Sequence, residues 1–198
     1  MASNYTEHYG LCQREATDQV LREEFNEDNA RIEAALDDVN AQVSVKKLLE
    51  YEITEPVTQF DVDVSPIAFE EFGEIKIVAA LQSGADVLMR LNGIADKQYG
   101  FGDYTSTGGG QGSFSDTYMA RFPAENRWAC GVLTSIVPAQ GRNVIFRNYC
   151  IGCSGGGISY SCGTSLSANV QWQQLNTLNF VGTSSIEVGS RVQIWGMR

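Results

Sequence analysis

Histidine is almost absent from this sequence of 198 residues, which contains only His8. Serine and cysteine hydrolases need a histidine as general base, and many zinc sites need one or more as ligands. One histidine in a polar N-terminal segment offers little for either chemistry. The composition therefore argues against most common enzyme mechanisms. We expect a protein that is not an enzyme and that holds no metal or cofactor.

Long apolar runs and positive charge are also scarce. No run approaches the roughly 18 apolar residues that span a bilayer, and residues 1–10 are polar rather than basic and then apolar. We expect neither membrane insertion nor a signal peptide, and hence synthesis in the cytoplasm. With 14 basic against 24 acidic residues the net charge is −10, which repels nucleic acid and anionic lipid.

Glycine and proline divide the chain in two. The first 55 residues contain one glycine and no proline, whereas residues 56–198 contain 19 of the 20 glycines and all four prolines. Pro56 marks the expected junction because a proline disfavours helix at the preceding residue. We expect an N-terminal segment at residues 1–17, a helical region at residues 18–55 and a second domain at residues 56–198.

Residues 18–49 have the composition of a long helix, with Thr17 as its N-cap. Its apolar positions are separated by seven, four, three and four residues, which is the alternation of a heptad seam. Asn29 falls on the same stripe, where a polar residue commonly fixes register and oligomer number. The predicted seam consists of Phe25, Asn29, Ile32, Leu36, Val39 and Val43.

The narrow apolar stripe favours self-association through a coiled coil, because the rest of the helix carries Glu, Asp, Arg and Gln. The alternative is an amphipathic helix that packs across the second domain of its own chain. Leu and Val at the a positions, with Ile and Val at d, do not distinguish a dimer from a trimer.

The second domain consists of short runs of β-branched and aromatic residues separated by Gly, Ser, Asn or Pro. About nine strands and no second helix predict an antiparallel β-sandwich or jelly roll. In the last strand Val192 and Ile194 alternate with other side chains, as they do in a half-buried strand. The expected strands are 74–81, 87–92, 117–122, 128–136, 143–149, 157–161, 166–172, 177–180 and 191–197.

Three groups of residues resemble chemical motifs, but each has a simpler interpretation. Residues 108–112 are glycine-rich like a phosphate loop, yet no Lys-Ser or Lys-Thr follows. Asp61 and Asp63 resemble a calcium-binding pair, yet the rest of an EF-hand loop is missing. Glu70, Glu71 and Glu74 are carboxylates of the kind that cleave glycosides, although a solvated acidic rim explains them as well.

Four cysteines, Cys130, Cys150, Cys153 and Cys162, would provide four thiolates for zinc or two disulfides. Because the chain has one CxxC and no histidine near it, we favour reduced or partly buried thiols, with both alternatives open. Cys12 stands apart from the others.

Several aromatic residues are candidates for stacking on sugar rings or for docking on a partner, since a ring offers large contact area at small entropic cost. The same rings would equally suit a hydrophobic core. The candidates are Tyr99, Phe101, Tyr104, Tyr160 and Trp172.

Motifs in both halves of the chain resemble a known class of proteins. The N-terminal half contains NYTEHYGL at residues 4–11, EATD at 15–18 and EFNEDN at 24–29. The second half contains DVLMRLNG at residues 86–93, followed by Tyr99, and GSRVQIWG at 189–196. The chain resembles tail-fibre and related virion structural proteins of phages and prophages of Firmicutes-type hosts. Arg14 stands where this resemblance leads us to expect an aromatic residue.

The resemblance implies a homotrimeric fibre in the virion, synthesised in the bacterial cytoplasm. Its N-terminal segment would attach to other virion proteins, a three-stranded coiled coil would form the stalk, and the β-sandwich head would contact a glycan or protein of the host surface. A capsid-attached head fibre or decoration protein would have the same sequence features. A small glycan depolymerase or esterase using Glu70, Glu71, Asp103 or Asp116 is the enzymatic alternative.

Overall fold

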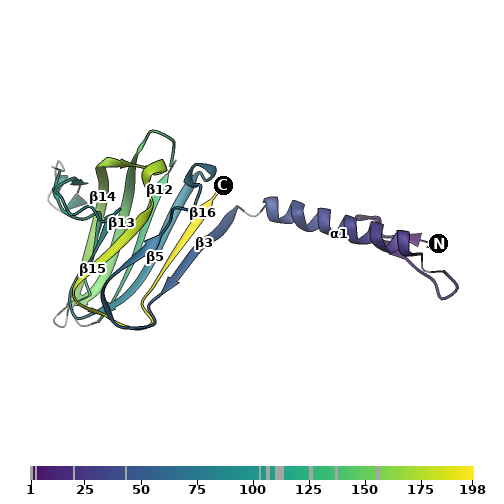
Figure 1. The fold of residues 1–198 in the computed structure, drawn as a ribbon, viewed down its shortest axis with the longest axis horizontal. Helices are drawn as coiled ribbons and strands as arrows, with labels where there is room; N and C mark the ends of the chain where they lie inside the picture. The colour runs from purple at the N-terminus through teal and green to yellow at the C-terminus, as the bar shows by residue number, and fades with distance from the viewer. Residues whose placement is uncertain are drawn as a thin grey trace. The chain divides into compact units, whose positions relative to one another are not determined.

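The protein forms two compact units, Met1–Ser44 and Val45–Arg198, in a computed structural model (Figure 1). The structure describes residues 2, 4–19, 21–42, 44–102, 104–105, 108–109, 114–124, 127–136, 138–154 and 157–198. The division falls just before residue 45, and therefore eleven residues before the junction expected at Pro56.

The first unit contains one long helix, α1 (Arg22–Gln42), preceded by two short paired strands, β1 (Asn4–Tyr5) and β2 (Cys12–Gln13). Glu23 and Glu24 in its first turn favour the helix because they face the positive end of its dipole. The helix is shorter than the expected 18–49. Thr17 lies in a turn before α1 rather than at its N-cap, and the backbone N–H of Asp18 donates to the carbonyl of Glu15 in that turn.

The expected helix was also wrong at its C-terminal end, because the residues from Val45 onward form a strand. Leu49, Tyr51 and Ile53 alternate toward the core with a period of two, which a strand satisfies and a helix does not. The strand β3 (Val45–Glu52) pairs with the last strand of the chain, β16 (Arg191–Met197). Pairing across the whole β unit thus decides the structure of this segment over its local propensity.

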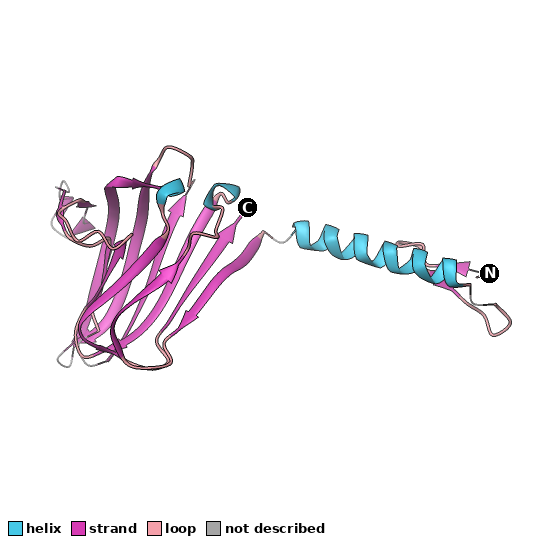
Figure 2. Ribbon diagram, in the orientation of Figure 1, coloured by secondary structure: helices cyan, strands magenta, loops and turns pink. Residues whose placement is uncertain are grey.

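The second unit is an antiparallel β structure with two short 3₁₀ turns, η1 (Phe69–Glu71) and η2 (Trp172–Gln174) (Figure 2). Besides β3 and β16, its longer strands are β4 (Val57–Asp63), β5 (Glu74–Ser83), β6 (Val87–Leu91), β12 (Arg127–Ile136), β13 (Asn143–Ser154), β14 (Gly157–Gln171) and β15 (Thr177–Ile186). The shorter strands are β7 (Tyr99–Gly102), β8 (Tyr104–Thr105), β9 (Gly108–Gly109), β10 (Phe114–Asp116) and β11 (Ala120–Phe122).

The main sheet curls so that two layers of strands face each other. One layer has the order β3-β16-β5-β12 and continues through β13, β14, β7 and β10, while the other has the order β4-β15-β6-β11. The layers are joined where Ile186 of β15 pairs with Ser83 of β5. The first four strands of each layer follow the order of a jelly roll, and the expected mainly β, antiparallel architecture is confirmed.

Most of the expected strands are present, with differences in extent. The strand expected at 191–197 has these bounds, and those expected at 74–81 and 143–149 extend to Ser83 and Ser154. The two strands expected at 157–161 and 166–172 form one long strand, β14. The sequence interpretation missed β4, which pairs with β15 along residues far apart in the chain.

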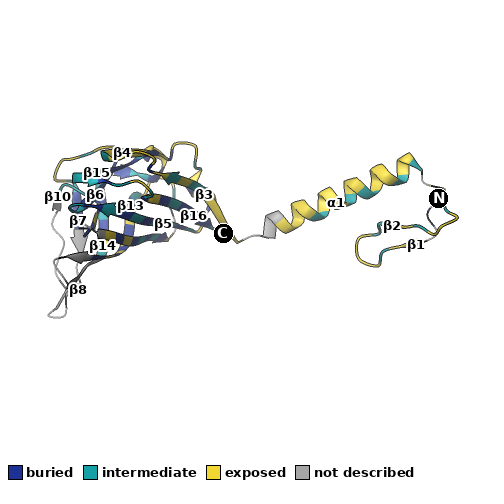
Figure 3. Cartoon of the chain, turned by 90° about the horizontal axis from the view of Figure 1, so that it is seen from below, coloured by how far each residue is buried: buried dark blue, intermediate teal, exposed yellow. Residues whose placement is uncertain are grey.

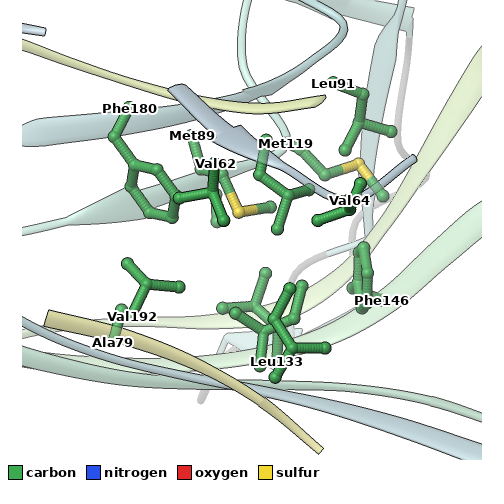
Figure 4. Close-up of a cluster of buried hydrophobic side chains, with 14 of the residues drawn as sticks. Val62, Val64, Ala79, Met89, Leu91, Met119, Leu133, Phe146, Phe180 and Val192 are labelled. Carbon is green, nitrogen blue, oxygen red and sulfur yellow. The ribbon is translucent and has the colours of Figure 1, made fainter. Parts of the chain in front are cut away.

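The core lies between the two layers. Figure 4 shows Phe180, Val62 and Met89 of one layer pointing toward Ala79 and Leu133 of the other. All of these side chains are nearly or fully buried. Aromatic rings add ordered packing on the same core, because Phe60 stacks between Tyr51 and Phe180 at centroid distances of 5.3 and 4.8 Å.

The core leaves no room for a side chain at Gly152 of β13. A Cβ at this position would overlap the carbonyl oxygen of Pro123, a backbone atom that cannot move without disturbing its own segment. A Cβ at the exposed Gly73, by contrast, would lie 3.7 Å from the carbonyl oxygen of Met197, an ordinary contact.

We predict that Gly152→Ala lowers the free energy of unfolding by roughly 1–3 kcal/mol or more, since overpacking forces the backbone to shift. The matched control Gly73→Ala should change it by less than about 1 kcal/mol. Urea denaturation at equal protein concentrations measures both values. Equal stabilities of the two variants would show that the Pro123 contact does not exist.

Candidate functional site: an apolar stripe on the helix

The stripe predicted as a coiled-coil seam is exposed on α1. At 100° per residue, its members from Phe25 to Val39 lie within a narrow arc of the helix surface. Phe25, Leu36 and Val39 are 57, 59 and 57% exposed, and most of α1 has the colour of exposed residues in Figure 3. Ile32 is 43% exposed and Asn29 is also exposed, whereas Val43 lies outside the described residues.

The N-terminal segment packs on a different side of the helix. Both carboxylate oxygens of Asp28 accept a hydrogen bond from the backbone N–H of Cys12, at 3.0 and 3.1 Å. One turn further along, the Arg31 guanidinium donates to the carbonyl of Gly10. Glu24 accepts from the backbone N–H of Ala2 at 3.1 Å, on the same flank of the helix. The segment therefore leaves the apolar stripe uncovered within this unit.

The unexpected Arg14 also contributes to this packing. Its guanidinium lies 3.5 Å from the carboxylate of Glu24, and both side chains are largely buried. Burial raises the pKa of the neighbouring Cys12 thiol, and the nearby Asp28 carboxylate adds to the increase.

Two of the five aromatic candidates belong to the core, and their expected role as ligand contacts is wrong. Tyr99 is fully buried, and its hydroxyl lies 3.0 Å from the backbone nitrogen of Leu91, which donates to it. Burial raises the pKa of this phenol. Trp172 is 3% exposed and packs against Phe69 and Phe146. The side chains of the other three candidates, Phe101, Tyr104 and Tyr160, lie outside the described part of the chain.

The described cysteines do not form the four-thiolate set that zinc would require. Cys150 points into the core, and burial raises its pKa to about 12. Cys130 is exposed on the opposite, outward side of the sheet, because its neighbours Ala129 and Gly131 are the buried positions of β12. Cys12, Cys130, Cys150 and Cys162 are all free thiols. The side chain of Cys153 lies outside the described residues.

Several of the candidate carboxylates form hydrogen bonds or an ion pair with neighbouring residues. The pKa of the Asp63 carboxyl is lowered by hydrogen bonds from Ser65, first from its side chain and then from its backbone N–H. Asp61 accepts from the side-chain amide of Asn179 at 2.5 Å. Glu70 and Glu71 are exposed in η1, and Glu71 lies 3.4 Å from the guanidinium of Arg198.

The described members of the remaining candidates lie in different strands. Glu74 begins β5, and Asp116 lies in β10, while Asp103 lies outside the described residues. Of residues 108–112, Gly108 and Gly109 form β9, which pairs with β8, and the others are not described. Among the described side chains, no group of three or more His, Cys, Asp or Glu residues is placed to hold a metal ion. None of the described helices is long and apolar enough to cross a membrane.

Comparison with known proteins provides no family assignment. No protein-family model matches the chain, and no curated protein matches its sequence. The geometry of the chain therefore carries the functional interpretation, together with the motif resemblance. The apolar stripe on α1 is the strongest feature of the first unit, because water-exposed apolar side chains in regular rows mark interaction surfaces.

We predict that Asp28→Ala releases the N-terminal segment from α1, because it removes the acceptor of the Cys12 N–H and leaves that donor without its partner. Loss of such a hydrogen bond lowers the stability of the docked segment by about 1–2 kcal/mol. Trypsin should then cleave after Arg14 several-fold faster, as followed by mass spectrometry. The control Asp37→Ala alters an exposed residue elsewhere on α1 and should leave the cleavage rate unchanged. Equal rates in the two variants would contradict the docked segment.

Proposed function

We propose that this protein is a non-enzymatic structural component of a bacteriophage particle, a homotrimeric tail fibre that contacts the host cell surface. The observation that carries the proposal is the exposed heptad stripe on an otherwise charged helix. The helix is joined to a separate β unit, as in a stalk with a head. The motif resemblance supports three strands over two and supports the proposal of a virion protein.

The architecture suits attachment to a repetitive surface. Three heads on one stalk present three copies of a weak site, and linked sites gain avidity of order 10²–10⁴ without stronger single contacts. The proposed ligand is a carbohydrate of the host surface, with a surface protein as the second class. Phe101, Tyr104 and Tyr160 are the proposed contact aromatics, since Tyr99 and Trp172 are buried.

The N-terminal segment is the proposed attachment point to other virion proteins. Its hairpin holds two tyrosines that do not serve a core, because Tyr5 and Tyr9 are 52 and 59% exposed. Exposed tyrosine rings are common in contact surfaces, where they bury large area at low entropic cost. Attachment to the capsid instead of the tail would use the same segment, so the capsid fibre is the alternative outcome of the tests.

We predict that wild-type protein has three times the 21.7 kDa mass of one chain, as measured by light scattering after size exclusion. Ile32→Asp, and likewise Phe25→Asp, should lower this mass toward that of one chain on dilution, because a charge would be buried in the seam. Glu33→Ala lies off the stripe and should retain the wild-type mass. A monomeric wild type would overturn the trimeric fibre. Seam variants that keep the wild-type mass at every dilution would overturn the heptad assignment.

We further predict that antibodies against the purified chain label the tails of phage particles released from the bacterium that carries the gene. Electron microscopy with gold-labelled antibodies locates the protein, and antibodies pre-absorbed with the purified chain are the control. Label on the capsid would support the capsid-attached fibre instead. Particles without label would contradict a virion protein, and release of reducing sugar from host polysaccharide would favour the depolymerase.

A further inference from the structure

The outward side of β12 is more apolar than its side facing the core. Trp128 and Ile136 are 45 and 77% exposed, and Cys130 and Val132 lie between them on the same outward side. Antiparallel sheets with one solvated face normally carry polar residues there, whereas strands that are covered on both faces are apolar on both. The inward residues of β12 are Ala129, Gly131, Leu133 and Ser135.

The neighbouring strands extend this surface in register. On β13, Ile151 lies opposite Cys130 and Tyr149 lies opposite Val132, and these two side chains are 36 and 55% exposed. On the other side of β12, Val78 of β5 lies opposite Val132. We call this surface the outer face and define it by Val78, Trp128, Cys130, Val132, Tyr149 and Ile151.

The outer face continues toward the start of β3. A hollow of about 440 Å³ lies on this side of the sheet. It shares Val78 with the outer face and is also lined by Val45, Trp195 and Met197, together with the polar Lys76 and Gln193. The apolar surface therefore reaches Val45, the first residue of β3.

We infer that the outer face is a second self-association surface, which packs against the β units of other copies of this chain. The inference rests on the proposed trimer, because the helix is what brings the copies together. Only residues 43 and 44 separate α1 from β3, so Val45 lies within about 11 Å of the helix end. In a helical trimer, the Val45 ends of the outer faces are thus close to one another.

Charge also favours another copy of the chain as the occupant. Each copy carries a net charge of −10, so copies repel wherever acidic surfaces meet. The six residues of the outer face are uncharged, and the flanking positions Lys76 and Arg147, which lie opposite Thr134 on either side of β12, are basic. The carboxylate of Glu74 lies at the margin, because Glu74 is opposite Ile136 on the same side of the sheet. Acidic chains can therefore approach each other over the six residues of the outer face without a carboxylate among them.

Cys130 provides a native probe of this surface in the full-length protein. If the outer face is covered, its thiol should react with N-ethylmaleimide at least tenfold more slowly in wild type than in Tyr149→Asp, as measured by peptide mass spectrometry. The matched control Val188→Asp places the same charge at a 51% exposed apolar residue outside the outer face. Its Cys130 should stay protected as in wild type, and buried Cys150 should remain unmodified in all three proteins.

The outcomes separate this inference from the proposed function. Trimeric mass with an equally reactive Cys130 in wild type and Tyr149→Asp would overturn the outer-face contact and leave the helical trimer standing. If the Ile32→Asp variant still associates at high concentration and its Cys130 is protected, the result would support the outer-face contact. It would also contradict the helix as the main contact. A monomeric wild type with reactive Cys130 would contradict both. If Cys150 reacts in Tyr149→Asp, the variant is unfolded, and loss of Cys130 protection on dilution of wild type provides the test instead.

Discussion

The antiparallel pairing of β16 with β3 on one side and β5 on the other is the interaction on which the rest of the β unit depends. It places the last strand of the chain between two of the earliest, with Ile194 opposite both Leu49 and Ile77. In the described structure β3 has no strand partner other than β16, so the segment that follows the helix is fixed by the C-terminus. Contacts between residues so far apart in the chain form late and slowly in folding, because the entropic cost of closing the loop comes before the free energy gained from the contact.

The same pairing explains which parts of the fold could be predicted from the sequence. β16 was predicted with correct bounds because Val192 and Ile194 alternate with outward side chains, and this pattern is local. β3 was assigned to the helix because its partner lies at the far end of the chain. Two of the five aromatic candidates were wrong for a related reason: Tyr99 and Trp172 are residue types common in ligand contacts, but only the tertiary structure shows that their neighbours bury them. The helical stripe could be predicted because its period of 3.5 residues is itself a sequence property.

The acidic composition limits how copies of this chain can associate. Much of the surface repels a second copy, so contacts must form where carboxylates are absent or lie at the margin. The stripe on α1 satisfies this condition, since Phe25, Ile32, Leu36 and Val39 form a row free of charge. The N-terminal segment preserves it by packing on the flank of the helix that carries Asp28 and Arg31. The polar contacts of the N-terminal segment and the exposed apolar stripe thus occupy different sides of the same helix.

A contact that is weak between separate β units becomes stronger when the copies of the chain are tethered to one another. Two isolated β units that meet through the outer face would have to overcome the full entropic cost of association. In the proposed trimer, copies joined at α1 would meet at an effective concentration in the millimolar range, because the connector between α1 and β3 is only two residues long. An apolar face that is too weak to bind alone would then become covered, which would end its exposure to other proteins. In the proposed assembly the short connector would therefore link the helical stripe to the contact between β units, and a longer, flexible connector would weaken that contact without altering either surface.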